Sequence, residues 1–137
     1  MDPAKTSTDG MRGTRWRGID HVQLAMPVGG EGVARSFFVD RLGFEEEPKP
    51  AALAERGGAW FRSGDTAVHV GAETDFSPAR KAHPAFRVIG LRQFVAETGL
   101  EVRWSDEIPG VIRCHLDDPF GNRIELVEAA PNRQELP

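Results

Sequence analysis

Apolar and polar residues alternate along several short stretches of the chain, a pattern typical of strands with one buried face. In the first of these stretches, residues 19–26, Val22 and Leu24 lie on one face. His21 and Gln23 lie on the other. The alternation therefore predicts a strand that carries a histidine and an amide on its polar side.

The rest of the first half predicts one helix and three more strands. Apolar residues at helical spacing predict a helix over 31–42, which Gly43 ends. A short strand at 44–47 follows, and then a mixed loop with one or two helical turns at 51–56. The last two strands, 59–63 and 66–70, form a predicted hairpin about Gly64-Asp65.

The second half repeats this order of elements. It predicts a strand, one helix that Gly99 ends, and three further strands. Each half is therefore strand, helix and three strands, which indicates an internal duplication of a βαβββ unit and an α+β fold. The predicted elements are strand 83–89, helix 91–98, and strands 100–104, 111–116 and 123–128.

The duplication also sets the expected boundaries. We expect an N-terminal arm at 1–17, a single domain at 18–130 and a C-terminal tail at 131–137. Within the domain, module one is expected to span 18–71, a polar linker 72–82, and module two 83–130. Trp16 is the one large apolar residue near the end of the arm, and we expect it to dock on the body or on a second subunit.

Composition narrows the class of protein. A chain of 137 residues with 39% hydrophobic and 28% charged residues is typical of one globular domain. A net charge of -4 without a basic stripe argues against nucleic acid as a partner, and no apolar run is long enough for a membrane span. The single cysteine, Cys114, excludes an internal disulfide and favours the cytoplasm. Its place off the polar face of its strand predicts a buried side chain, not a nucleophile.

Histidines stand at matching places in the two halves. His21 and His83 each belong to the first strand of a half, while His69 and Glu125 each belong to a last strand. The spacing within a half is 48 residues in one case and 42 in the other. Imidazole and carboxylate groups at four equivalent positions could surround one divalent ion such as Ni, Zn, Fe, Co or Mn. The competing interpretation is that each histidine is a hydrogen-bonded structural residue.

Glu125 stands in the most informative stretch of the chain. The turn 118–122 leads into the strand 123–128, in which Ile124 and Leu126 share one face and Glu125 lies on the other. A carboxylate that lines a pocket needs a cation, because burial of an unpaired charge is costly. Glu125 is therefore expected either to be paired with a cation in a pocket or to be exposed to solvent.

Further polar and aromatic residues could line the same pocket. Arginines there would suit a carboxylate or phosphate on a substrate, although a solvated strand edge or an ion pair explains them equally well. His115 has no evident counterpart in the first half. The five candidates for substrate binding are Gln23, Trp60, Arg87, Arg113 and His115.

Taken together, these residues make the chain resemble the vicinal oxygen chelate superfamily, which includes glyoxalase I, fosfomycin-resistance and bleomycin-resistance proteins and extradiol dioxygenases. The resemblance covers about 18–129. It rests on the stretches 19–24, Phe37-Phe38 followed by Leu42-Gly43-Phe44, 67–70, 83–88 and 118–126. It implies that the paired βαβββ modules curl into an open cup around a metal.

The resemblance also implies roles for individual residues. Metal ligands in this superfamily come from the first and last strands of each module, which here are His21, His69, His83 and Glu125. Glu125 would also be catalytic, since such a carboxylate can move a proton in glyoxalase-type sites. His69 stands where glyoxalase I enzymes carry Glu, so it is either a fourth ligand or a substrate contact. The absence of tyrosine weakens the extradiol dioxygenase and fosfomycin-resistance readings.

Three functions follow as hypotheses. The first is a metal-dependent, glyoxalase-like enzyme that acts on a small oxygen-rich molecule by isomerase, lyase or dioxygenase chemistry. The second is a metal-free protein that binds a small molecule or antibiotic, as bleomycin-resistance proteins do. The third is an interaction module that makes its contact through Trp16. The resemblance further implies a homodimer.

Overall fold

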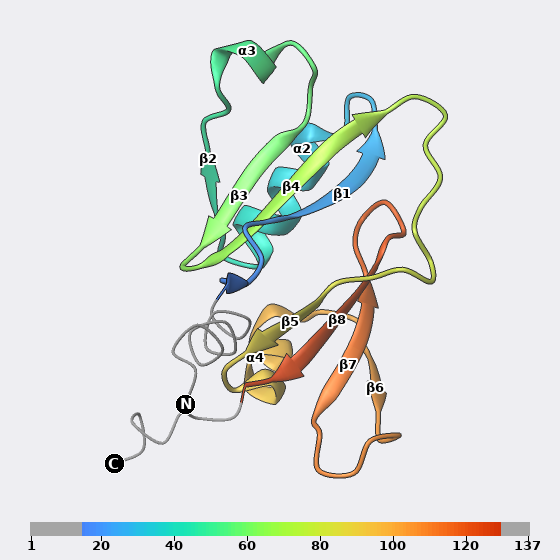
Figure 1. The fold of residues 1–137 in the computed structure, drawn as a ribbon. Helices are drawn as coiled ribbons and strands as arrows, with labels where there is room; N and C mark the ends of the chain where they lie inside the picture. Colours follow the sequence, from blue (N-terminus) through green and yellow to red (C-terminus); the bar gives the residue numbers. More distant parts are fainter. Residues whose placement is uncertain (1–14, 130–137) are drawn as a thin grey trace, which may run out of the picture.

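Two four-stranded sheets form the computed structural model of the chain, which describes residues 15–129. Each sheet is mixed, with a parallel pair at one side and antiparallel pairs beyond it (Figure 1). The first sheet has the order β1-β4-β3-β2, from β1 Val22–Pro27, β2 Glu45–Glu47, β3 Ala59–Ser63 and β4 Thr66–Glu73. The second has the order β5-β8-β7-β6, from β5 Ala85–Val88, β6 Arg103–Ser105, β7 Arg113–Asp117 and β8 Arg123–Glu128.

The two strand orders are the same when β5 to β8 are read as β1 to β4. The predicted duplication of a βαβββ module is therefore confirmed, and so is the α+β class. Residues 1–14 of the expected arm and the whole expected tail, 131–137, lie outside the described residues. Trp16 is 85% exposed, so it does not dock on the body of its own chain.

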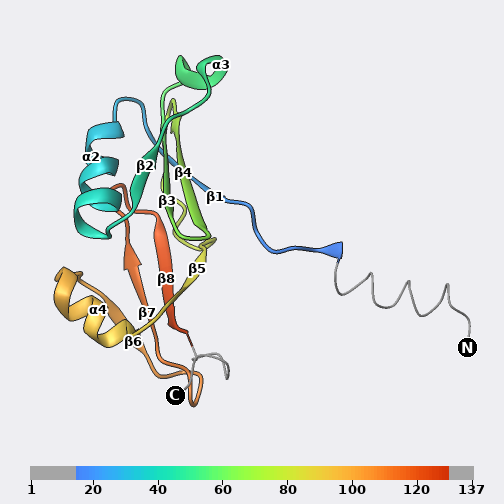
Figure 2. The same ribbon diagram turned by 90° about the vertical axis from the view of Figure 1, so that its left-hand side faces the viewer.

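Both main helices lie on one side of the two sheets, as Figure 2 shows. The predicted helix over 31–42 is present as α2 Glu31–Arg35, which continues as a wider π-helix, η1 Ser36–Arg41. The predicted turns near 51–56 form the short helix α3 Ala51–Ala54. The helix α4 Leu91–Thr98 has the predicted bounds, because left-handed glycines flank it at 90 and 99.

Six of the eight predicted strands have different limits in the structure, and the two largest differences have a clear cause. β4 runs on to Glu73, three residues beyond the predicted end, because it pairs with all six residues of β1. β6 begins at Arg103, where pairing with β7 starts, and not at Leu100, whose side chain is buried in the core. No helix among residues 15–129 is both long and apolar enough to cross a membrane.

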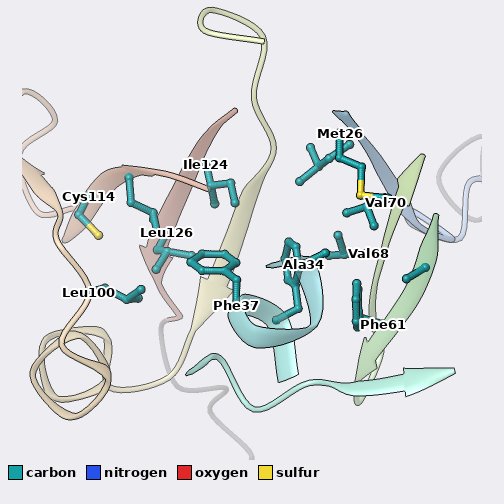
Figure 3. Close-up of a cluster of buried hydrophobic side chains, with 14 of the residues drawn as sticks. Met26, Ala34, Phe37, Phe61, Val68, Val70, Leu100, Cys114, Ile124 and Leu126 are labelled. Atoms are coloured by element: carbon teal, nitrogen blue, oxygen red, sulfur yellow. The ribbon is translucent and has the colours of Figure 1, made fainter. Parts of the chain in front are cut away.

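The two modules share one hydrophobic core. Phe38 of η1 stacks on Phe61 of the first sheet, with ring centroids 5.1 Å apart. The adjacent Phe37 points the other way, toward Leu126 of the second sheet (Figure 3). Consecutive residues project in different directions from a helix, so a neighbouring pair can serve two sheets. Cys114 is fully buried in this core, as predicted, and burial raises the pKa of its thiol.

A buried turn between β7 and β8 joins the two modules by hydrogen bonds. Asn122 is 1% exposed, and its side-chain amide donates to the carbonyl of Ala25 in β1 and to Asp118 Oδ2, both at 2.8 Å. Its side-chain oxygen accepts from the amide of Ala79 in the linker at 2.9 Å. Asp118 Oδ1 in turn accepts from the backbone N–H groups of Phe120 and Asn122. This turn therefore fixes the start of β8 against module one.

Candidate functional site

The predicted ligands occupy equivalent places in the two sheets. In module one, β1 and β4 pair Gln23 with His69, and His21 stands two residues before Gln23. In module two, β5 and β8 pair Ala85 with Glu125, and His83 stands two residues before Ala85. The matching of the halves thus extends to the pairing of individual residues.

The same register gives His115 a counterpart that the sequence did not reveal. Trp60 of β3 pairs with His69, and His115 of β7 pairs with Glu125. His115 therefore occupies in module two the position that Trp60 occupies in module one. The expectation that His115 has no counterpart was wrong, because the counterpart is an aromatic residue of another type.

Two histidines and one carboxylate converge in module two. His83 Nε2 lies 2.9 Å from Glu125 Oε1, and His115 Nε2 lies 3.4 Å from the same oxygen. One possible ligand atom from each residue lies within 4.8 Å of the others. His83 Nδ1 lies 2.8 Å from the carbonyl oxygen of Lys81, which suits a protonated Nδ1 and leaves Nε2 for the site.

Arg113 holds the other oxygen of the carboxylate. Its Nη1 donates to Glu125 Oε2 at 3.2 Å, and its Nη2 lies 3.5 Å from a carboxylate oxygen of Glu107. The Arg113 side chain is 13% exposed, and among residues 15–129 its Nε is buried without a partner. Burial alone would raise the pKa of Glu125, but the hydrogen bonds from His83 and Arg113 outweigh it and lower that pKa. Glu125 is therefore ionised at neutral pH.

Three aromatic rings stack side by side in module one. The rings of Trp60 and His69 have centroids 4.1 Å apart and planes 5° apart. The rings of His69 and His21 have centroids 4.0 Å apart and planes 15° apart. Burial, and then the nearby His21, lower the pKa of His69, so its imidazole is neutral at pH 7. His21 Nδ1 lies 2.9 Å from the carboxylate of Asp20, a residue that was not among the predicted site residues.

A hollow of about 690 Å³ lies over this stack. Gln23 lines this hollow. The side-chain amide of Gln23 fits only because residue 71 is glycine, since a Cβ there would lie 2.6 Å from Gln23 Nε2. Charged residues line the hollow as well, and Arg62 among them is paired with Glu47 at 3.1 Å. The cationic residues in the lining are Lys49, Arg56 and Arg62. These were missed because nothing in their spacing links them to the histidines; the pairing of β2 with β3 is what brings Glu47 and Arg62 beside Trp60.

The nine predicted site residues therefore fall into two clusters and one outlier. Among the described residues, the one group with metal-ligand geometry joins His83 and Glu125 to His115, and it leaves out His21 and His69. Arg87 is exposed and lines, with Phe86, an apolar crevice between the modules, and it makes no hydrogen bond or ion pair with either cluster among the described residues. The first cluster is His21, Gln23, Trp60 and His69, and the second is His83, Arg113, His115 and Glu125.

Both clusters lie on the faces of the sheets that the helices leave uncovered. Phe61 and Val68 face η1, so by strand alternation Trp60 and His69 face away from it. Leu126 likewise packs in the core, and Glu125 faces away. The helices lie on the same side of both sheets in Figure 2, so the two polar clusters are presented in a common direction.

Comparison with solved structures places this fold. A glyoxalase family protein from Bacillus anthracis has 47% sequence identity and a TM-score of 0.79, with 84% of this chain and 97% of that chain covered. The chain belongs to the glyoxalase family. Its superfamily is the vicinal oxygen chelate group that the sequence resembles.

More distant structures share the fold of this glyoxalase family member. A glyoxalase/dioxygenase from Nostoc punctiforme has 21% identity and a TM-score of 0.64, with 84% of this chain and 92% of that chain covered. TnmS3, an antibiotic binding protein from Streptomyces sp. CB03234, has 22% identity and a TM-score of 0.61, with 84% and 100% covered. No protein-family model and no curated protein matches the sequence.

Proposed function

We propose that this glyoxalase family member is a metal-dependent enzyme that acts on a small, oxygen-rich substrate. The observation that carries the proposal is the convergence of His83, His115 and Glu125, whose possible ligand atoms lie within 4.8 Å of one another. Two imidazoles and one carboxylate are a donor set typical of divalent metal sites.

The residues present fit a divalent transition metal. The donors are two imidazole nitrogens and one carboxylate oxygen, a mixed set that suits Ni, Zn, Fe, Co or Mn. The lowered pKa of Glu125 supports the fit, because a carboxylate must be ionised to bind a cation. A bound ion would polarise adjacent substrate oxygens and stabilise the negative charge that develops on them.

The chain's own residues prepare the site for such chemistry. The Lys81 carbonyl orients the His83 ring, and Arg113 orients the Glu125 carboxylate. Glu125 is the candidate for moving a proton, through the oxygen that Arg113 does not hold. The donor set is compatible with isomerase, lyase and dioxygenase chemistry, each of which would use the open positions of a bound metal for neighbouring substrate oxygens.

A homodimer is the proposed assembly, and the cytoplasm the proposed location. The two polar clusters lie on separate sheets of one chain and are presented in the same direction, so they do not face each other. A second copy related by a twofold axis would turn its aromatic cluster toward the metal cluster of the first. The substrate would then lie between the metal cluster of one protomer and the partner's hollow over Trp60.

A metal-free binding protein is the second candidate. This candidate is favoured by the stack of Trp60, His69 and His21 and the hollow of about 690 Å³ over it. A small molecule could bind there without any contact with the proposed metal ligands of module two. TnmS3, which shares the fold, is an antibiotic binding protein. This candidate predicts tight binding of small molecules without any dependence on metal.

Metal content tests the proposal directly. Untagged protein, reconstituted in turn with Zn, Ni, Fe, Co and Mn and then desalted, is expected to hold about one ion per chain by elemental mass spectrometry. Glu125→Gln, which keeps the shape but removes the charge, should lose the ion. Glu107→Gln is the matched control, because Glu107 also contacts Arg113 but is 82% exposed. Retention of no metal by the unaltered protein would leave the metal-free binding protein as the function.

A further inference from the structure

We propose that the apolar crevice between the two modules binds a free carboxylic acid with an apolar tail, and that Arg87 pairs with its carboxylate. The crevice is lined by core residues such as Val68 and Leu126, which face the helices. It is therefore separate from the two polar clusters, which lie on the opposite faces of the sheets. The inference goes beyond the proposed function and does not depend on a metal.

The crevice is too large for an ordinary packing gap. Its volume is about 190 Å³. Protein interiors contain few voids larger than a water molecule, because each unfilled apolar cavity destabilises the fold. A cavity of about 150 Å³ lined by Leu, Ile and Phe is known to bind benzene, so this crevice can take a tail of about eight carbon atoms.

Both modules supply apolar walls to the crevice. Several of these side chains are only half-buried, among them Phe44, Phe86 and Val88, so water reaches their apolar surface. An aliphatic tail would remove that surface from water, which is the main source of affinity for such a ligand. The walls include Phe38, Phe44 and Val68 from module one and Phe86, Val88 and Leu126 from module two.

Arg87 is the one charged residue in the described lining of the crevice. It is exposed, and its side chain has no hydrogen-bond or ion-pair partner within residues 15–129. A guanidinium can bind a carboxylate through two parallel hydrogen bonds, a geometry that an ammonium group lacks. A cation beside an apolar cavity therefore favours an acid as the head group of the ligand.

The hairpin between β3 and β4 adds two hydroxyl groups to the same lining. Ser63 and Thr66 are register partners beside the turn, and both line the crevice. A hydroxyl group can donate a hydrogen bond to a carboxylate oxygen. Asp65, in the same turn, is exposed and does not belong to the lining, so the described lining contains no acidic side chain that would repel the ligand.

Calorimetric titration of the metal-free, full-length protein with sodium octanoate tests the proposal. We expect one octanoate per chain, and we expect hexanoate to bind about tenfold more weakly, because each buried methylene tightens binding about fourfold. Octylamine, which has the same tail but the opposite charge, should bind more weakly than octanoate.

Two arginine variants test the head group. Arg87→Gln should weaken octanoate binding about fivefold and leave the binding of 1-octanol unchanged, because only the acid pairs with the guanidinium. Arg92→Gln is the matched control: Arg92 lies over the ring of Trp104 and outside the crevice, so its replacement should change the binding of neither ligand.

A variant that fills the crevice tests the place of the tail. Val88→Phe should weaken octanoate binding at least about fiftyfold without loss of stability to urea, because a ring in an apolar cavity gains contacts. Leu42→Phe fills the crevice from module one and replaces Val88→Phe if that variant does not fold. In nuclear magnetic resonance spectra, octanoate should shift the methyl signals of Val68 and Leu126 and leave the ring signals of His83 and His115 unchanged.

Four results would overturn the proposal. The first is no binding of octanoate, and the second is binding that survives both filling variants, which would show that the acid lies elsewhere. The third is an equal effect of Arg87→Gln on octanoate and 1-octanol. The fourth is a dimer that Val88→Phe dissociates and that does not bind octanoate, because the crevice would then be an interface between copies of this chain. Metal content is measured separately, so the proposed function stands or fails independently of these results.

Discussion

Replacement of Asn122 by Ala should cost this protein a large part of its stability. The change removes three side-chain hydrogen bonds, to Ala25, Ala79 and Asp118. Each such bond contributes about 1 kcal/mol, and fully buried partners left unpaired would add more. The two backbone partners are partly accessible to water, so we expect a loss of about 3 kcal/mol instead of about 5 kcal/mol. Urea unfolding at pH 7, followed by tryptophan fluorescence, measures the change.

Two further variants identify the cause of the loss. Asn122→Asp keeps the volume but removes both donated bonds and sets a second carboxylate beside Asp118, so it should be at least as destabilising as Ala. Gln93→Ala is the control, because it removes an exposed amide bond to Glu97 on α4 and should change stability by less than about 0.5 kcal/mol. A near-native Asn122→Asp, or a loss below about 1 kcal/mol for Ala, would refute the claim that hydrogen bonds at this turn join the modules.

Three more outcomes are expected from urea unfolding. Burial lowers the pKa of His69, so the unfolded chain binds protons more readily and stability should fall as the pH drops below about 6.5. His69→Gln should flatten this pH dependence, and an unchanged slope would show that His69 is not its source. Arg41→Ala should cost about 1–2 kcal/mol, because the guanidinium caps the last carbonyls of α4, and equal stability would show that this cap is not needed. Gly58→Ala should cost at least about 2 kcal/mol, because φ is +91° there and a Cβ would collide with the Val70 carbonyl oxygen. Gly64→Ala is the control: φ is also positive but the space around it is open, so it should cost only about 1 kcal/mol.

The sequence predicted well those features that depend on local periodicity. The limits of α4 and β8 were correct because glycines and a turn bound clear patterns. The duplication was visible because both halves keep the same order of elements. The π-helical turn of η1 was not predictable, since its apolar spacing is also compatible with an ordinary α-helix.

The candidate site was predicted less completely, because it depends on register and on the relative placement of the two sheets. His115 and Glu125 were both recognised, but their contact follows from the pairing of β7 with β8, which alternation alone does not fix. The separation of His21 and His69 from the metal cluster depends on how the sheets sit side by side. The parallel stack of Trp60 with His69 depends on rotamers, about which a sequence pattern carries no information.

The phenylalanine pair of η1 has a consequence for how this duplicated chain unfolds. Phe38 packs on Phe61 of the first sheet, and Phe37 packs toward Leu126 of the second, so one helix supplies core to both halves. Loss of the second sheet would expose Phe37, and loss of η1 would uncover Leu126. We therefore expect a chain that is twofold in its sequence to unfold as one cooperative unit, because each half completes the core of the other.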